Sequence, residues 1–116
     1  MSVQGISVVV KTSDRQAAVE QYGALLQSDI LEEFEIEVSG LTVTVFPGLS
    51  ILSGTEAALS VADSLVATAF VDSIGSTEQQ LVKAGWTIAG SLGSPNSLLA
   101  RDANGSIIEF VERGDH

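Results

Sequence analysis

The sequence predicts an α+β protein made of two tandem β-α-β-β-β units. Three observations lead to this prediction. The order strand, helix and three strands occurs twice along the chain, and turn residues separate the segments. The second half ends in an acidic hairpin at 102–112, whereas the first half lacks the matching carboxylate. A length of 116 residues with 45% hydrophobic content suits a single domain, and we expect residues 1–116 to form one.

The first unit is expected over residues 5–53. A run rich in β-branched residues opens it, and Ser13 with Gln16 fits a capping box at the start of an amphipathic helix. Strict alternation then predicts a strand with one wet and one buried face, and Ser39-Gly40 and Pro47-Gly48 mark the following turns. The expected elements are strands at 5–12, 33–38, 41–46 and 49–53 and a helix at 14–27.

The second unit is expected over residues 64–113, after a linker of small and acidic residues at 54–63. Ser76 with Gln79 predicts the start of its helix, and Gly85 stands where helices commonly stop. Asn104-Gly105 is a strong hairpin signal. The expected strands are 65–72, 86–91, 97–102 and 106–112. A four-stranded ferredoxin-like sandwich is the rival fold, but it leaves several of these segments unused.

Composition excludes some functions. The chain carries 15 acidic and 5 basic residues, a formal charge of −10, so it would repel the phosphates of a nucleic acid. No apolar run approaches the ~20 residues that cross a membrane. Without cysteine there is no disulfide or thiolate ligand, and we expect a cytoplasmic protein. The acidic charge favours a cationic partner or serves solubility alone.

The order and spacing of several segments resemble the vicinal oxygen chelate superfamily, which includes glyoxalase I, bleomycin resistance proteins and extradiol dioxygenases. The resemblance covers nearly the whole chain and is carried by residues 6–14, 65–72, Ala84-Gly85-Trp86 and 102–109. It implies a curled mixed sheet around a cavity, helices on the outer face, and a homodimer.

The resemblance also places the metal-ligand positions of the superfamily on this chain. They fall at Ser7, near Leu52, at Val66 or its neighbour Ala67, and at Glu109. A catalytic site for a divalent ion typically takes three or more carboxylate or imidazole donors from the protein. These positions supply one carboxylate, and His116, the only histidine, is the terminal residue. We therefore predict no metal and no cofactor.

Glu109 is the polar residue that most needs an explanation. Alternation places it on one face of the last strand and Ile108 and Phe110 on the other, which the resemblance assigns to a helix. A carboxylate among apolar neighbours has a raised pKa and suits a base or a cation anchor. Alternatively, it bonds to a hydroxyl of a neighbouring strand or to Arg101. The candidate ligand-binding residues are Ser7, Thr68, Phe70, Trp86, Phe46 and Glu109, although core packing is the other interpretation of the three aromatic residues.

Three hypotheses for function follow. The first is a metal-independent binding protein that sequesters a small organic ligand, cationic or antibiotic-like, in a cleft of a homodimer. The second is a metal-independent isomerase or lyase with Glu109 as general base. The third is a domain that serves only dimer formation or protein contacts. The unfilled metal positions favour the first over an enzyme.

Overall fold

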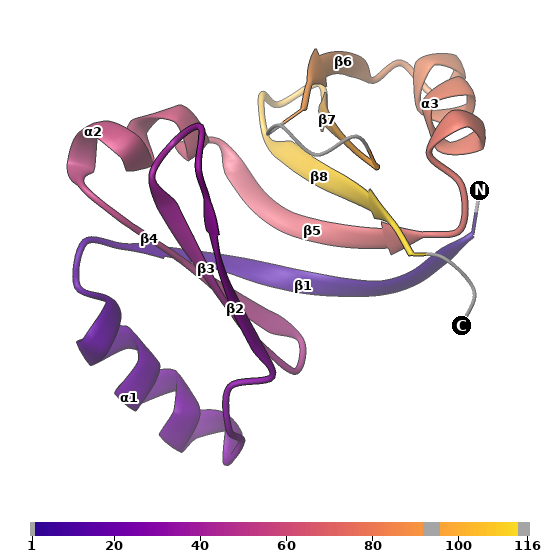
Figure 1. Cartoon of the computed structure of the whole chain (residues 1–116). Coiled ribbons are helices and arrows are strands. Elements are labelled where there is room, and N and C mark those ends of the chain that lie inside the picture. The colour runs from indigo at the N-terminus through magenta and orange to yellow at the C-terminus, as the bar shows by residue number, and fades with distance from the viewer. Residues whose placement is uncertain (1, 92–95, 114–116) are drawn as a thin grey trace. The chain divides into compact units, whose positions relative to one another are not determined.

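The computed structural model describes residues 2–91 and 96–113 and contains the two predicted β-α-β-β-β units (Figure 1). The elements of the first unit are β1 (Val3–Thr12), α1 (Arg15–Leu26), β2 (Glu32–Ile36), β3 (Leu41–Phe46) and β4 (Leu49–Ser53). The expected linker contains α2 (Glu56–Leu59) and the short 3-10 helix η1 (Ser60–Ala62). The elements of the second unit are β5 (Leu65–Val71), α3 (Ile74–Lys83), β6 (Thr87–Gly90), β7 (Ser97–Arg101) and β8 (Ile107–Glu112).

The strands form one mixed sheet in the order β2-β3-β4-β1-β5-β8-β7-β6. Contacts divide the chain into an N-terminal unit, Ser7–Asp63, and a C-terminal unit, which combines Met1–Ile6 with Ser64–His116. Strand β1 thus contributes to both. Each unit pairs its first and last strands in parallel, β1 with β4 and β5 with β8, and adds the other two strands antiparallel. The α+β prediction of two β-α-β-β-β units is confirmed.

Both helices begin at a different residue from the one predicted. The Oδ1 atom of Asp14 accepts a hydrogen bond from the amide of Ala17, which makes Asp14 the N-cap of α1 in place of Ser13. Ser73 caps α3 in the same way, because its Oγ accepts from the amide of Ser76. A capping side chain must lie just before the first free amides. Ser76, the predicted start, therefore lies inside the first turn of α3.

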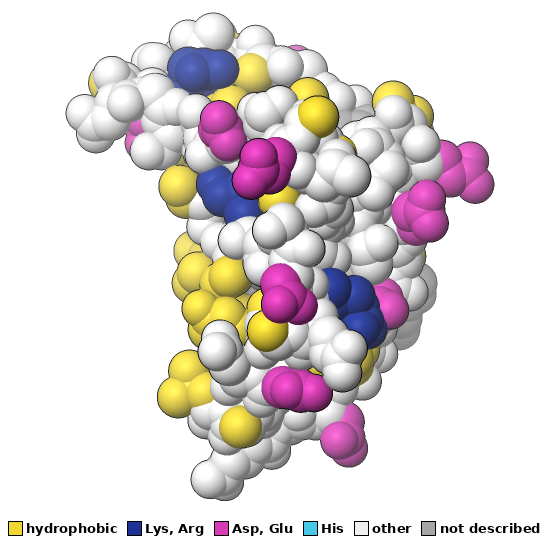
Figure 2. Space-filling view, turned by 90° about the vertical axis from the view of Figure 1, so that its left-hand side faces the viewer, with side chains coloured by type: hydrophobic (Ala, Val, Ile, Leu, Met, Phe, Trp, Pro, Cys, Tyr) yellow, Lys and Arg dark blue, Asp and Glu magenta, His cyan; other side chains and the backbone are white. Residues whose placement is uncertain are grey.

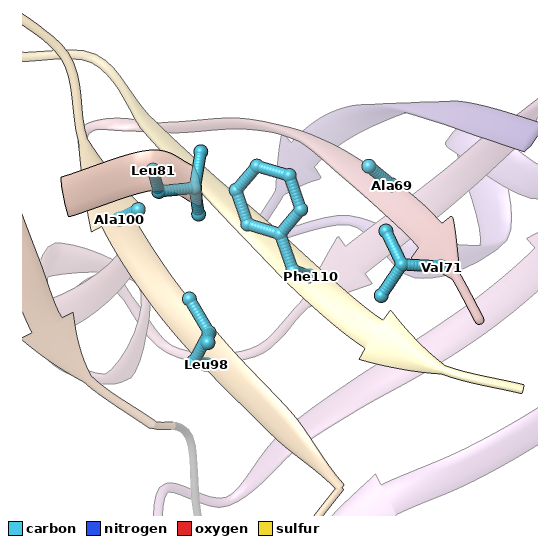
Figure 3. Packing of buried hydrophobic residues seen from close by; sticks show 6 residues of the cluster. All are labelled: Ala69, Val71, Leu81, Leu98, Ala100 and Phe110. Atoms are coloured by element: carbon cyan, nitrogen blue, oxygen red, sulfur yellow. The ribbon is translucent and has the colours of Figure 1, made fainter. Parts of the chain in front are cut away.

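Each unit has its own apolar core between its helix and one face of its strands. In the N-terminal unit, α1 packs on β3 and β4, and Phe46 and Ile51 lie beneath Ala18. In the C-terminal unit, α3 packs on β6, β7 and β8. The buried cluster there consists of Ala69, Val71, Leu81, Leu98, Ala100 and Phe110, with the Phe110 ring between the helix and the strands (Figure 3).

The edge strand β2 differs from the prediction of one buried face. Phe34 is 45% exposed, and among the residues of β2 only Ile36 is even partly buried. A strand face is buried when another layer packs over it, and β2 is an edge strand that pairs with β3 alone. Glu33 accepts hydrogen bonds from Arg15 of α1 and from Thr44, and these bonds hold the pKa of the Glu33 carboxyl below its ordinary value. This edge is fixed by polar contacts rather than by a core.

Candidate functional site

Glu109 lies on the face of the C-terminal unit that the helix α3 does not cover. Its neighbours Ile108 and Phe110 point into the helix-side core, so alternation turns Glu109 to the opposite face, as predicted. The pairing registers of β5 and β7 with β8 place further side chains beside it. We call this surface the Glu109 face; its members are Thr68, Phe70, Ser97, Leu99, Arg101, Ile107, Glu109 and Val111.

The immediate surroundings of Glu109 are one hydroxyl and several aliphatic groups. Thr68 stands opposite Glu109 in the parallel pair β5–β8, and its Oγ1 donates a hydrogen bond of 3.3 Å to Oε1. Leu99 stands opposite on β7. Burial among these groups raises the pKa of the Glu109 carboxyl, and the Thr68 hydrogen bond opposes this only in part. The hydroxyl-bonded interpretation of Glu109 is thus confirmed, with Thr68 as the partner.

The second carboxyl oxygen of Glu109 accepts no hydrogen bond from the described residues. Among the described residues, every fully buried polar side-chain atom has a hydrogen-bond partner. Thr68 is the one side chain in residues 2–91 and 96–113 that bonds to Glu109, and it uses Oε1. The remaining oxygen, Oε2, is therefore not fully buried.

The N-terminal unit has a hydroxyl pair where the C-terminal unit has Thr68 and Glu109. Val9 pairs with Ser50 in the N-terminal unit, and Thr68 pairs with Glu109 in the C-terminal unit. Thr68 comes 59 positions after Val9, and Glu109 comes 59 positions after Ser50. The helix caps Asp14 and Ser73 keep the same offset. Ser50 is therefore the counterpart of Glu109. Its Oγ lies 3.0 Å from that of Ser7, and both serines are buried.

Comparison with known proteins was made at the level of sequence and of structure. No protein-family model matches the sequence, and no curated protein matches it. An uncharacterised protein from Methanosarcina mazei has a similar structure, with a TM-score of 0.84 and 28% identity over 97% of this chain and 94% of that one.

Two further solved structures have named folds or activities. Methylmalonyl-CoA epimerase from Mycobacterium tuberculosis has a TM-score of 0.67 and 20% identity over 97% of this chain and 90% of its own. A glyoxalase/bleomycin resistance protein/dioxygenase superfamily member from Vibrio splendidus has a TM-score of 0.57 and 9% identity, covering 97% and 100%. The chain has the vicinal oxygen chelate fold.

The metal-ligand positions of the vicinal oxygen chelate fold carry few donors here. From the sequence, the fourth-strand position was expected near Leu52. The register instead makes Ser50 the counterpart of Glu109, so this position carries an alcohol and not a carboxylate. The N-terminal unit then offers Ser7 and Ser50, and the C-terminal unit offers Val66 and Glu109. Among the described residues, no three His, Cys, Asp or Glu side chains gather as a metal ion would require. These residues do not fit a catalytic divalent ion. His116 lies outside the described residues.

The other residues predicted to contact a ligand do not all lie together. Thr68 and Phe70 share the Glu109 face, and Ser7 belongs to the N-terminal unit. Phe46 is 2% exposed in the core beneath α1. Trp86 packs on the helix-side core of the C-terminal unit, edge-to-face with Phe110 at a centroid distance of 6.2 Å. Packing accounts for Phe46 and Trp86, so we leave both out of the candidate site.

Sequence analysis did not single out Arg113, which joins the site from the end of β8. Its guanidinium lies 3.7 Å from the centroid of the Phe70 ring, a cation–π contact. A Cβ atom on Gly5 would stand 3.8 Å from Cδ2 of the same ring. The continuing alternation of β8 past Glu109 and Val111 is the signal that could have found Arg113.

No helix among the described residues is long and apolar enough to span a membrane.

Proposed function

We propose that the protein binds a small organic ligand on the Glu109 face without a metal ion. The observation that supports this most is the state of Glu109 itself. A carboxyl group among aliphatic side chains is costly to desolvate, yet among the described residues this one has a single hydrogen bond, from Thr68, and a second oxygen without one. Such a group is better suited to binding a ligand than to stabilising the fold.

The Glu109 face offers both parts of an organic-ligand site. Phe70 and Leu99, both partly buried, give an apolar surface. The Thr68–Glu109 pair gives a fixed polar point. Small-molecule sites commonly combine an apolar lining with a few polar groups that fix orientation. A homodimer and a cleft at its two-fold interface belong to this proposal.

The experiment is a thermal-shift screen of the full chain against divalent metals and a panel of aromatic and cationic antibiotics. We expect upward shifts with organic compounds and none with metals. Glu109→Gln should reduce these shifts. Glu78→Gln, which removes one charge from an exposed position on α3, should leave them unchanged. A shift with metals alone, or equal shifts in both variants, would overturn the proposal.

A metal-independent isomerase or lyase is the second candidate, favoured by the raised pKa of Glu109. A carboxylate with a raised pKa is a stronger base, which suits removal of a proton from carbon. One similar structure is a methylmalonyl-CoA epimerase in complex with methylmalonyl-CoA, with a TM-score of 0.67 and 16% identity. Incubating this protein with methylmalonyl-CoA in D2O and following deuterium incorporation by NMR tests the idea. Incorporation that disappears in Glu109→Gln supports an enzyme, and no incorporation favours simple binding.

A further inference from the structure

The charges of the Glu109 face differ in sign from those of the whole chain. The chain has a net charge of −10, and acidic side chains lie scattered over the face shown in Figure 2. On the Glu109 face, by contrast, the strand residues include one carboxyl, Glu109, and one guanidinium, Arg101, and Arg113 follows at the end of β8. Local charge, rather than net charge, decides which ligand such a surface accepts.

Arg101 lies close to Glu109 but is not paired with it. Arg101 stands opposite Ile107 and Leu99 opposite Glu109, so Arg101 is the diagonal neighbour of Glu109 across β7 and β8. Diagonal positions are about 7–8 Å apart, within reach of a long side chain. The ion pair found within residues 2–91 and 96–113 is instead Arg15–Glu33. Both Arg101 and Glu109 therefore remain available to a ligand.

Arg113 is held in place without a carboxylate of the described residues. Its guanidinium stacks on Phe70, which stands two residues after Thr68 on the same face. Stacking occupies the flat surface of a guanidinium and leaves the N–H groups at its edge to bind an anion. Burial also disfavours the ionised form of Glu109, which weakens the one negative charge on the surface.

We propose that the ligand of the Glu109 face is an apolar organic anion whose acidic group pairs with Arg101 or Arg113. This inference rests on the proposed function, because it assigns a charge to the ligand proposed there. The apolar part would lie over Leu99 and beside Phe70, and Thr68 and Glu109 would supply hydrogen bonds. A cationic ligand, predicted from net charge alone, would instead meet two guanidinium groups on this surface.

The test compares two fluorescent probes with the same body. The probe 1-anilinonaphthalene-8-sulfonate carries a sulfonate, and N-phenyl-1-naphthylamine is its uncharged counterpart; proflavine serves as the cationic aromatic probe. Titrations of the full chain use Arg101→Gln, Arg113→Gln and the control Lys83→Gln, which removes a positive charge from the end of α3. We expect at least one arginine variant to weaken sulfonate binding about ten-fold, since a charged hydrogen bond is lost, and Lys83→Gln to have no such effect.

The outcomes separate this inference from the proposed function. Sulfonate binding that is equal in the wild type and both arginine variants would overturn the anion proposal. So would tight binding of proflavine or the uncharged probe with no binding of the sulfonate, although small-molecule binding would then stand. Binding of none of the three probes would count against both. Circular dichroism of each variant verifies that a lost signal does not come from unfolding.

Discussion

The N-terminal and C-terminal units repeat one fold but not one chemistry. The registers of the parallel pairs β1–β4 and β5–β8 and the caps of α1 and α3 coincide at an offset of 59 residues. At the same structural position, however, the first unit buries the hydroxyl pair Ser7–Ser50 and the second places Glu109 beside Thr68. The repeat therefore fixes backbone positions, and the side chains at those positions make the second unit the site of the proposed ligand.

The basic residues show the same division. In the N-terminal unit, Lys11 donates to the carbonyl oxygens of Ala62 and Asp63, and Arg15 pairs with Glu33, so both serve the fold. In the C-terminal unit, Arg101 and Arg113 lie beside the Glu109 face without a carboxylate partner among the described residues. Basic groups stabilise the first unit and stay available in the second.

Truncating the core aromatic residue of each unit gives the largest expected effect. Phe46→Ala and Phe110→Ala should each lower the free energy of unfolding by about 3–5 kcal/mol, because both leave a cavity in a buried cluster. Phe110→Ala should cost about 1 kcal/mol more, since it also loses the edge-to-face contact with Trp86. Urea unfolding measures both. Phe34→Ala, at a position 45% exposed, is the control, and an equal loss there would contradict this account of the cores.

Much of the fold could be predicted because its strands and helices carry clear periodic patterns. The start of α1 was missed since several capping residues stand side by side, and only backbone geometry selects among Thr12, Ser13 and Asp14. The start of α3 was missed because Ser73 and Ser76 are both capping residues, and only the structure shows that Ser73 precedes the helix. Glu109 was placed on the correct face because Ile108 and Phe110 mark the core side. The counterpart of Glu109 on β4 was expected near Leu52 and is Ser50. These two residues share a face, and only the pairing with β1 distinguishes them.

The aromatic residues were harder to place than Glu109 for a related reason. β3 carries apolar residues on both faces, so alternation does not show that Phe46 points toward α1. Trp86 precedes β6 and follows no strand pattern. Arg113 was overlooked because it lies just beyond the last strand, where its stacking on Phe70 depends on the pairing of β5 with β8.

Introducing the Thr68–Glu109 pair at the equivalent positions of the first unit should have an intermediate effect on the free energy of unfolding. Ser50→Glu places a larger, ionisable group at a position 7% exposed, and we expect a loss of about 1–3 kcal/mol. Adding Val9→Thr reproduces the Thr68–Glu109 pair by register and should recover about 1 kcal/mol through one hydrogen bond. Urea unfolding of the single and double variants measures this. A double variant no more stable than Ser50→Glu would contradict the equivalence of the two positions.

The smallest expected effect comes from Glu109→Gln, and its sign depends on pH. Burial raises the pKa of Glu109 in the folded protein above its ordinary value of 4.5, so the contribution of Glu109 to stability is most favourable below that pH and is lost as pH rises through the folded pKa. Glutamine keeps an acceptor for Thr68 and carries no charge. Glu109→Gln should therefore match the stability of the wild type at pH 4 and exceed it at pH 8, which thermal unfolding at the two pH values measures.

Thr68→Val makes this last prediction sharper. The Thr68 hydroxyl stabilises the ionised form of Glu109, so its removal should raise the pKa of the carboxyl further and steepen the loss of stability with pH. NMR titration of the Glu109 side-chain carboxyl carbon gives the pKa directly, and thermal unfolding across pH gives the stability. Thr68→Val also places at position 68 the residue type of its counterpart Val9 in the first unit. An unchanged Glu109 pKa in Thr68→Val would show that the hydroxyl does not govern the carboxyl, and the contrast between the units would then rest on burial alone.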